Sequence, residues 1–519
     1  MGSKLWPWNW GEKASQKERK PFRDGKRYQA AEASGLERDI YPTWERNFND
    51  LVARSNPRLR QRVYRMTRNF PPFVRAIKVL QAFIIGEGGR FESLAERPNG
   101  EPDLKLRKEI ERRFSRWTKK ATVDNRLNFY ESQLLALKQK LETGEFFNVF
   151  RTRKSGPRKG ELALQFIEPE RVTSSVITYA DTGDVIVEQG IEFDRHTGER
   201  FAYYVEPTDP ALKVASQERI PEEQVIHGFE TLRPGQLRGV TPFAPAIILA
   251  DCMFDYMEAE LDGAKMAAKW LAFVTSPSPK ETQMMRVRGK KDDASENSRI
   301  EEIENCVIEY LKTGEEIKFS ASSDRVKDNF DRFARFVLRM VGVTMGVPYE
   351  LISGDYTGVN YSTSRMSRQD FNLILKPERH WMKTAFNESV FEEWLKFEAL
   401  KNPSFFPDYF ENPERYQKAL WIPAGMPSPD PLKEGKADID NIKAGLVAPQ
   451  DVILARGDDP EMVIARRVEW KKMEEDNGLK SEIDQISTWE STNPAALEKE
   501  AEAKKDGGDG GDEDGEEEA

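Results

Sequence analysis

Hydrophobic positions along the chain follow a helical period over most of its length and an alternating period over one stretch. Between about residues 42 and 95, apolar side chains such as Val63 and Met66 recur at helical spacing up to a glycine-rich stop at 86–89. A second helical pattern occupies residues 104–141. Both patterns predict that the N-terminal region is largely helical.

Between about residues 146 and 230, apolar side chains recur at every second residue. Leu162, Leu164 and Phe166 alternate with polar residues, and turn sequences such as Asp181-Thr-Gly183 separate short apolar runs. Alternation bounded by turn residues is typical of short antiparallel strands. This part of the chain therefore predicts a sheet built from hairpins.

Helical patterns return in the second half of the chain. Pro377 interrupts one of them, and a proline inside a helix removes one backbone hydrogen bond and commonly kinks it. A charged segment of roughly fifty residues predicts a small α/β insertion, with a strand at Ile317-Lys-Phe319. These patterns together predict an α+β protein. The helical segments are 242–273, 324–345, 365–400 and 421–478.

The stretch 346–365 lies between two helical patterns and differs from both. Its sequence is Gly-Val-Pro-Tyr-Glu-Leu-Ile-Ser-Gly-Asp-Tyr-Thr-Gly-Val-Asn-Tyr-Ser-Thr-Ser-Arg, which is polar and rich in glycine. Gly, Pro, Asn and Asp favour turns and loops. We therefore expect an exposed loop whose task is not core packing.

Four carboxylates form a stripe within the helical segment 242–273. Asp251, Asp255, Glu258 and Asp262 recur at spacings of four, three and four, which places them on one helix face. One interpretation is a solvated face in which Asp262 pairs with Lys265, an interaction of a few tenths of a kcal/mol. The other is that the stripe faces a channel or a neighbouring subunit. The spacing leaves both open.

The net charge of −10 conceals an asymmetry between the two ends of the chain. Residues 1–70 contain 16 Lys and Arg against 8 Asp and Glu, whereas residues 498–519 contain 3 basic against 11 acidic residues. The body between them is about as acidic as the whole chain. Phosphate contacts dominate affinity for DNA, so an acidic body suits a surface past which DNA slides. An ordinary acidic cytosolic protein has the same balance.

The residues that usually carry catalysis or bind metals are sparse. Cys252 and Cys306 are isolated, and three histidines (His196, His227 and His380) are scattered, so neither a disulfide framework nor a Cys- or His-based metal site is expected. The sequence contains neither a GxxxxGK[ST] phosphate loop nor a GxSxG nucleophile elbow. We expect no enzymatic activity, no cofactor, no secretory signal and no membrane span.

Six separated segments resemble, in the same order, the lambda-type family of phage portal proteins. The stretch 346–365 is the most similar of them. Because the segments are spread over about residues 28–478, the resemblance covers most of the chain. The others are 28–41 (Tyr-Gln-Ala-Ala-Glu-Ala-Ser-Gly-Leu-Glu-Arg-Asp-Ile-Tyr), 68–78 with its end at Gly86-Glu-Gly88, 233–245 (Arg-Pro-Gly-Gln-Leu-Arg-Gly-Val-Thr-Pro-Phe-Ala-Pro), 430–436 (Asp-Pro-Leu-Lys-Glu-Gly-Lys) and 456–460 (Arg-Gly-Asp-Asp-Pro).

The resemblance implies a portal-type subunit with a mixed α/β wing, a helical stem, a small α/β clip, a kinked tunnel helix and a helical crown. The two ends of the chain are expected to be a flexible arm and a disordered acidic tail. The implied ranges are 1–40 for the arm, 41–240 for the wing, 241–276 for the first stem helix, 277–322 for the clip, 323–346 for the second stem helix, 347–364 for the tunnel loop, 365–405 for the tunnel helix and its return to the wing, 406–480 for the crown and 481–519 for the tail.

The resemblance also implies a function. Such proteins form a homo-oligomeric ring, typically of twelve subunits, at one capsid vertex of the virion, through which double-stranded DNA is packaged and ejected. The implied partners are terminase, a head-completion or adaptor protein, the major capsid protein and DNA without sequence specificity, with assembly in the host cytoplasm. The alternatives are an ATPase or nuclease subunit of the packaging machinery and a structural adaptor without a channel.

Three groups of residues are the candidates for this function. The stem stripe described above is the first. The tunnel loop is expected to touch DNA weakly, and its two arginines either contact phosphates or, as we favour, pair with acids of neighbouring subunits. The clip is expected to contact terminase or the adaptor. The loop residues are Asp355, Tyr356, Thr357, Asn360, Tyr361, Arg365 and Arg368, and the clip residues are Arg286, Arg288, Lys290 and Lys291.

Overall fold

The computed structural model describes the central part of the chain and leaves out both ends and several internal segments. The four clip cations, together with the expected N-terminal arm and acidic tail, lie outside the described residues. The described residues are 48–173, 178–179, 184–207, 217–269, 273–275, 316–318, 323–423, 425 and 430–478.

The N-terminal helices form where the apolar period predicts them, but each predicted helical region is divided in two. Pro71 begins the second helix of the first region, where proline is tolerated because the first turn has no partner for an N–H group. Asn128 caps the last helix in a reciprocal capping box with Glu131. These helices are α1 (Phe48–Asn69), α2 (Pro71–Ile84), α3 (Leu104–Thr118) and α4 (Phe129–Thr143).

The alternating region folds into two antiparallel sheets, as predicted. A three-stranded sheet has the order β3-β2-β9, and a five-stranded meander has the order β4-β5-β6-β7-β8. The strands of the first sheet are β2 (Glu145–Thr152), β3 (Leu162–Ile167) and β9 (Val225–Phe229). Those of the second are β4 (Thr178–Tyr179), β5 (Val185–Glu188), β6 (Ile191–Asp194), β7 (Arg200–Val205) and β8 (Glu218–Pro221).

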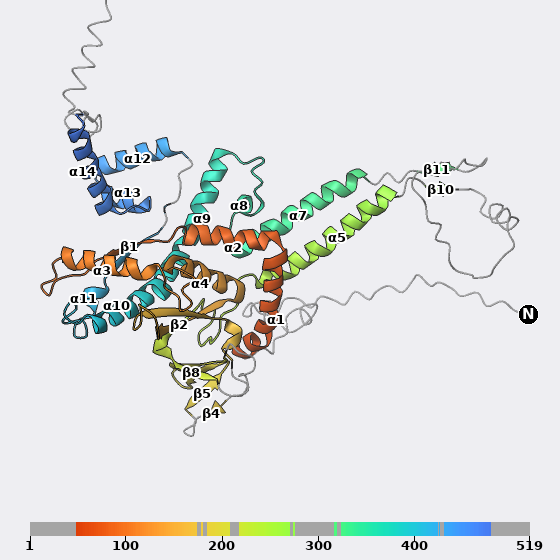
Figure 1. The fold of residues 1–519 in the computed structure, drawn as a ribbon. Helices are drawn as coiled ribbons and strands as arrows, with labels where there is room; N and C mark the ends of the chain where they lie inside the picture. Colours follow the sequence, from red (N-terminus) through yellow and green to blue (C-terminus); the bar gives the residue numbers. More distant parts are fainter. Residues whose placement is uncertain are drawn as a thin grey trace, which may run out of the picture.

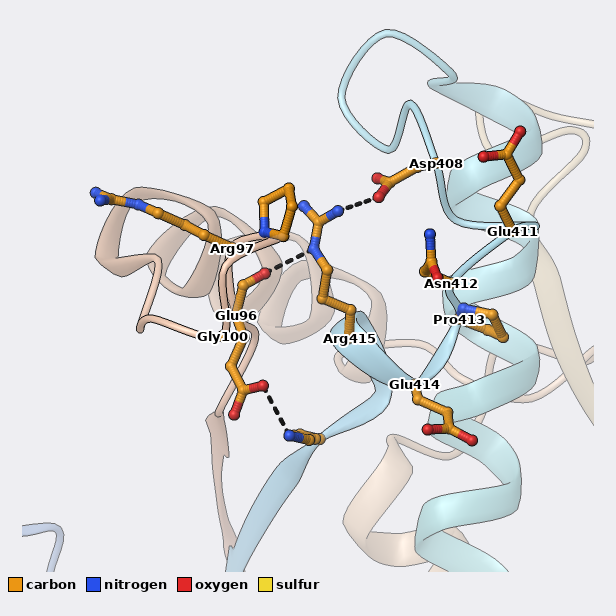
Figure 2. Close-up of a pocket in the computed structure, with 11 residues that line it drawn as sticks. Glu96, Arg97, Gly100, Asp408, Glu411, Asn412, Pro413, Glu414 and Arg415 are labelled. Carbon is orange, nitrogen blue, oxygen red and sulfur yellow. Dashed lines mark hydrogen bonds and ion pairs between the residues drawn. The ribbon is translucent and has the colours of Figure 1, made fainter.

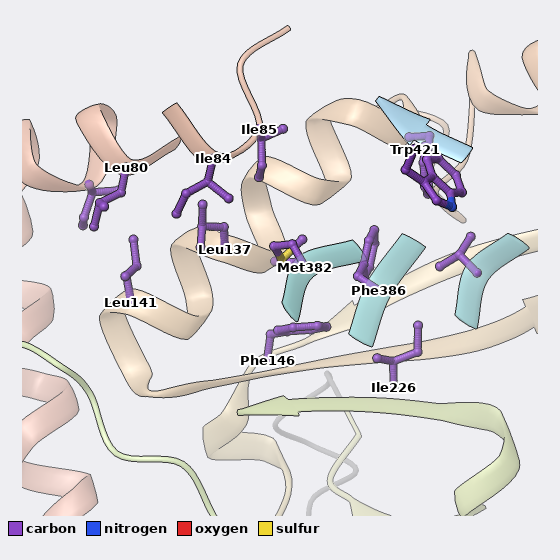
Figure 3. Packing of buried hydrophobic residues seen from close by; sticks show 14 of the residues in the cluster. Leu80, Ile84, Ile85, Leu137, Leu141, Phe146, Ile226, Met382, Phe386 and Trp421 are labelled. Carbon is purple, nitrogen blue, oxygen red and sulfur yellow. The ribbon is translucent and has the colours of Figure 1, made fainter. Parts of the chain in front are cut away.

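The larger core joins segments that are distant in the sequence. Side chains of α2, α4, β2 and β9 meet Met382 and Phe386 from the second half of the chain (Figure 3). Phe114 of α3 packs edge-on against Phe391 and Trp394, with ring centroids 5.4 and 5.0 Å away. A smaller core, which includes Phe147, lies between the two sheets.

The chain returns to this core after residue 400. Strand β1 (Arg90–Ser93) pairs antiparallel with β12 (Ala419–Ile422), and Trp421 lies 4.9 Å from Phe91 between ring centroids. Residues 406–422, which the resemblance assigns to the crown, thus pack with the body: Phe406, Tyr409 and Tyr416 are all buried in the main core. Helix α10 (Ser389–Lys401) precedes this return, and the short helix α11 (Glu414–Gln417) lies within it.

Two long helices run side by side and project from the body, α5 (Ile247–Lys269) and α7 (Ser323–Met345) (Figure 1). Tyr256 of α5 contacts Phe330 and Phe333 of α7, with ring centroids 5.7 and 5.0 Å away. Beyond them, β10 (Phe273–Thr275) pairs antiparallel with β11 (Glu316–Lys318), so a strand forms close to the position predicted within the insertion.

The chain then passes through a short helix, α8 (Tyr349–Ser353), into the long helix α9 (Tyr361–Met382). Helix α9 runs through Pro377 and changes into a π-helical turn at Lys383–Glu388 before α10. Pro377 is exposed, so water can satisfy the carbonyl that loses its backbone partner there. Helix α9 is thus continuous through Pro377, and the π turn follows six residues after the proline.

Three C-terminal helices lie apart from the body in Figure 1: α12 (Pro431–Lys443), α13 (Pro449–Ala455) and α14 (Pro460–Asp476). The ion pair Arg90–Asp458, at 2.9 Å, ties them to β1. The backbone of Gly425 also lies close to that of Arg456, because a Cβ on Gly425 would lie only 2.0 Å from the carbonyl oxygen of Arg456.

Candidate functional site

The segment from α7 to α9 forms a tight turn that depends on two glycines. The carbonyl oxygen of Val347 would lie 2.6 Å from a Cβ on Gly342, whose own carbonyl accepts a hydrogen bond from Val347 N at 2.9 Å. Gly346 has φ +63°, and a Cβ there would lie 2.9 Å from Ile374 of α9. A left-handed conformation in so small a space favours glycine. The turn therefore brings α9 close to the base of α7.

Helix α8 is anchored to the body within the stretch predicted to be a loop. Its Ile352 is buried, as is Val347 just before it, and Arg75 of α2 donates from Nε to the carbonyl of Leu351 at 2.9 Å. The exposed loop is therefore shorter than the polar composition of 346–365 predicts. It consists of residues 354–360 and is held at a fixed place beside α2.

Asp355 organises the start of this loop. Its carboxylate accepts hydrogen bonds from the backbone N–H of Thr357 at 3.0 Å and from the Tyr349 hydroxyl at 3.3 Å, and it lies 3.4 Å from the Arg335 guanidinium. The hydroxyl and backbone of Thr357, followed by the charge of Arg335, lower the pKa of the Asp355 carboxyl. Asp355 and Thr357 therefore shape the loop.

Asn360 ends the loop and begins α9. Its side-chain oxygen accepts a hydrogen bond from Thr363 N at 2.8 Å, the usual role of an N-cap residue. Tyr361 is thus the first residue of α9, and its side chain lies outside the described set. Of the predicted loop contacts, Asn360 is used to cap a helix.

Three of the predicted residues do not shape the loop or cap the helix. Tyr356 at the tip of the loop is 60% exposed, Arg365 on the first turns of α9 is exposed, and Arg368 is half-buried. Within the described part of the chain, neither arginine has a hydrogen bond or an ion pair. A guanidinium can pair with a phosphate or a carboxylate, and a tyrosine can stack or donate a hydrogen bond.

The four stem carboxylates all lie exposed on α5. They face away from α7, because Met253 and Tyr256 occupy the packed side and the stripe lies about opposite at 100° per residue. Asp262 pairs with Lys265 at 2.9 Å, as the solvated interpretation predicts. The other three carboxylates (Asp251, Asp255 and Glu258) have no ion pair among the described residues, so the geometry is compatible with both interpretations.

A polar hollow of about 560 Å³ lies between the loop after β1 and the segment around α11 (Figure 2). Its charged groups are largely paired with one another: Arg415 pairs with Asp408 and also donates to the carbonyl of Glu96, while Lys418 pairs with the Glu96 carboxylate at 2.7 Å. Neither His nor Cys lines it. The hollow thus lies where two parts of the body meet.

No helix among the described residues is long and apolar enough to cross a membrane. The same residues also contain no group of three or more His, Cys, Asp and Glu side chains placed to hold a metal ion.

A buried charged cluster, which the sequence did not reveal, connects the body to the base of α5. Glu145 at the start of β2 is fully buried and accepts hydrogen bonds from Arg60, from Arg238 at 2.8 and 3.0 Å, and from the backbone N–H of Gly239 at 2.9 Å. Arg238 also donates to the carbonyls of Val172, Gln189 and Pro169 at 2.7, 2.7 and 2.8 Å. The cluster thus links α1, both sheets and the segment leading to α5.

His227 completes this cluster as a neutral side chain. Its Nε2 lies 3.0 Å from Glu145, and burial lowers the pKa of His227 to about 4. Arg238, His227 and Arg60 outweigh the effect of burial and lower the pKa of Glu145. A carboxylate only accepts, so Nε2 carries the proton and Nδ1 can accept from Arg200 at 3.3 Å. His227 therefore bridges Glu145 and Arg200 inside the body.

Comparison with known proteins gives consistent results. The sequence model of the family described as "Phage portal protein, lambda family" matches residues 41–379. The chain is 26% identical over 423 residues to the probable portal protein of Halomonas phage phiHAP-1, which covers 80% of each chain. It is 23% identical over 352 residues to portal protein B of Escherichia phage lambda, covering 63% of this chain and 65% of that one.

A further relative is the portal protein of Escherichia phage N15, 22% identical over 332 residues, which covers 59% of this chain and 62% of that one. Among solved structures, a chain from the neck of a native gene transfer agent particle is 12% identical with a TM-score of 0.43, over 78% of this chain and 94% of that one. The family match alone spans more than half of the 519 residues. The chain therefore belongs to the lambda family of phage portal proteins.

Proposed function

We propose that the chain is one subunit of the portal ring at a capsid vertex, through which double-stranded viral DNA enters and leaves the head. Membership of the lambda portal family carries this proposal. The mixed fold supports it, because a compact body of helices and sheets carries a pair of projecting helices and a short exposed loop at their base (Figure 1).

The partners follow from this placement. The subunit associates with further copies of itself, typically to a ring of twelve, and is assembled in the host cytoplasm before it becomes part of the virion. Terminase and then a head-completion or adaptor protein dock on the clip, where Arg286, Arg288, Lys290 and Lys291 supply positive charge. The major capsid protein surrounds the ring.

The role of the subunit is structural, as in its family, and a separate ATP-driven terminase supplies the work of packaging. The polar hollow described above contains mutual ion pairs, which fits a protein that guides DNA without catalysing a reaction on it.

The tunnel loop is proposed to act as a gate around moving DNA. Arg75 and the Asn360 cap hold its two ends, so the tip bearing Tyr356 is positioned and does not need to fold on contact. In a ring, one loop becomes a circular constriction. Contacts from such a tip to phosphate and sugar position a duplex without reading its sequence.

Arg365 and Arg368 are proposed to pair mainly with acids of the neighbouring subunit, with phosphate contact as the second possibility. Their freedom from partners within the described chain supports a partner elsewhere. The stripe on α5 is proposed to repeat around the ring as an acidic belt, which weakens phosphate binding and lets the duplex slide.

The test uses phage that carry Tyr356→Ala or Arg365→Ala, with Lys376→Ala as the matched control. Lys376 is also an exposed cation on α9 but lies further from the loop. We expect the control to behave as the natural protein. Phage with Tyr356→Ala should lose packaged DNA more readily. Arg365→Ala should lower the stability of the ring in salt if Arg365 pairs with a neighbouring subunit, or lower the retention of DNA if it contacts phosphate. If both variants match the control in ring stability and in retained DNA length, the assignment of the loop is wrong.

A further inference from the structure

Helix α1 lies along one side of the body (Figure 1) and buries one of its faces there. Val63 and Met66 are buried on this packed face. Arg60 lies on the same face and is buried as well, with its charge paired to Glu145. The outer face carries five more arginines, all exposed, which we call the α1 arginine stripe: Arg54, Arg58, Arg62, Arg65 and Arg68.

The stripe is continuous along the helix. At 100° and 1.5 Å per residue, its five positions fall within an arc of about 120° and extend over about 21 Å. Neighbouring arginines in it are three or four residues apart, a spacing at which like charges destabilise a helix. Asp50 is the one carboxylate within Phe48–Asn69, and it precedes the stripe. The stripe therefore does not serve the stability of α1 itself.

The stripe has no carboxylate partner among the described residues. None of its five arginines forms an ion pair there, and Arg68 donates to the backbone carbonyl of Tyr64 at 3.0 Å. By contrast, Arg219, which is also exposed, pairs with Glu192 at 2.7 Å. The chain has 89 Asp and Glu against 79 Lys and Arg. In such a chain, a row of five unpaired arginines points to an anionic partner outside the described residues.

The chain contains an anionic segment that matches the stripe. Residues 506–519, which we call the acidic segment, comprise eight Asp and Glu, five Gly and no Lys or Arg. Carboxylates and guanidinium groups form strong, charge-assisted hydrogen bonds. Residues 479–505 connect α14 to this segment and span up to about 90 Å when extended. A compact chain of this length has a radius of gyration of about 24 Å, so the segment can reach α1.

We propose that the acidic segment binds along the α1 arginine stripe and covers it. An extended stretch of about seven residues spans the roughly 21 Å of the stripe, so the segment is long enough to follow it from end to end. Its eight carboxylates supply a partner for each of the five arginines. This inference concerns a single chain and does not depend on the ring proposed above.

Tethering favours this occupant over DNA phosphates, which the same guanidinium groups also bind. A segment linked to the chain has an effective concentration of about 1 mM at its binding site. It therefore competes with any polyanion in solution that is more dilute. The acidic segment thereby limits the non-specific binding of nucleic acid to α1, a binding that phosphate contacts dominate.

The experiment is modification of arginines with phenylglyoxal, read by mass spectrometry on the full-length protein and on a truncation after Lys505. We expect the stripe to react about tenfold more slowly in the full-length protein at low salt, as for a segment at about 1 mM with a dissociation constant of about 0.1 mM. At about 1 M salt, where the Debye length is about 3 Å, this difference should disappear. Arg126, whose side chain is 84% exposed, is the internal control and should react alike in both proteins.

Two variants separate the charge of the segment from its length. In the first, the eight acids of the segment are replaced by Asn and Gln, and the stripe should then react as in the truncation. In the second, Arg58→Glu and Arg65→Glu together reverse the charge at the centre of the stripe, so Arg54, Arg62 and Arg68 should lose their protection. Both substituted residues are exposed on the outer face, so the packed face of α1 is left unchanged.

Three results would overturn the inference. If the stripe reacts equally fast in the full-length and truncated proteins, the segment does not cover it, and protection of both by an added DNA duplex would assign the stripe to DNA. Protection that survives truncation would mean that another part of the chain or a second copy covers the stripe. Protection by the neutral segment would exclude charge as its cause. None of these results decides whether the protein forms a ring with a channel, so the proposed function is tested separately.

Discussion

The buried cluster around Glu145 provides the sharpest prediction about stability. Arg238→Met removes a guanidinium that donates to Glu145 and to three backbone carbonyls while keeping much of the side-chain volume. Glu145 then retains Arg60 and His227 but loses one of its two buried cations. The carbonyls of Val172, Gln189 and Pro169 lose their charged donor as well.

The expected magnitude follows from burial. Breaking one side of a buried ion pair costs about 3–5 kcal/mol, because the remaining charge stays desolvated. Arg151 offers a matched control on the same strand, since it forms an ion pair with Glu218 at 2.7 Å while its side chain is 28% and that of Glu218 55% exposed. An exposed pair of this kind contributes about 0–1 kcal/mol.

The assay is native-state hydrogen exchange of the β2 and β9 amides, because a chain with several parts does not unfold in one step. Arg238→Met should lower the free energy of opening of these strands by about 3–5 kcal/mol, which is about 10²–10³-fold faster exchange or more. Arg151→Met should change it by less than about 1 kcal/mol. If the two variants behave alike, the cluster does not stabilise the body as argued.

Three further predictions concern local groups. His227 has its pKa lowered to about 4 from an ordinary value of about 6.5, so the unfolded chain takes up this proton first as the pH falls. The free energy of unfolding of the body should therefore decrease from pH 6.5 to pH 4. Urea titrations should find a weaker dependence of this free energy on pH in His227→Gln. Gly346→Ala should destabilise α8, because both the φ of +63° and the contact with Ile374 oppose a Cβ at this position. Gly358→Ala is the control: its φ is +76° but the space around it is open, so only the backbone cost of about 1–2 kcal/mol is expected. If α8 amides exchange equally fast in both variants, the clash with Ile374 does not contribute. Asn360→Ala should destabilise the first turn of α9 by about 1 kcal/mol, whereas Asn360→Asp should retain the cap, and exchange rates of those amides distinguish the two.

The fold could be predicted from the sequence wherever residues close together in the chain determine the local structure. Apolar periods predicted α5, α7 and the sheet region to within a few residues, and the ordered motifs identified the family, which the family match confirms. The loop at 346–365 was only partly foreseen: Val347 and Ile352 are buried, and the Asn360 cap starts α9 before Arg365. An Asn three residues before Thr363 is a helix-start signal that could have shown this.

The charged cluster could not be found in the same way. Arg60 and Arg238 lie 85 and 93 residues from Glu145, and no local period connects them. The packing of α1 against α4, the pairing of β2 with β9 and the return of the 230–240 segment bring the three together. The roles of the tunnel-loop tip, the α5 stripe and the clip stay predictions, because they depend on neighbouring copies and on DNA.

Electron microscopy of the purified full-length protein tests the central claim most directly. If the chain is a portal subunit, class averages should show closed rings with a central channel wide enough for duplex DNA, with the loop around Tyr356 at the narrowest point. Compact monomers, or closed assemblies without a channel, would contradict the account.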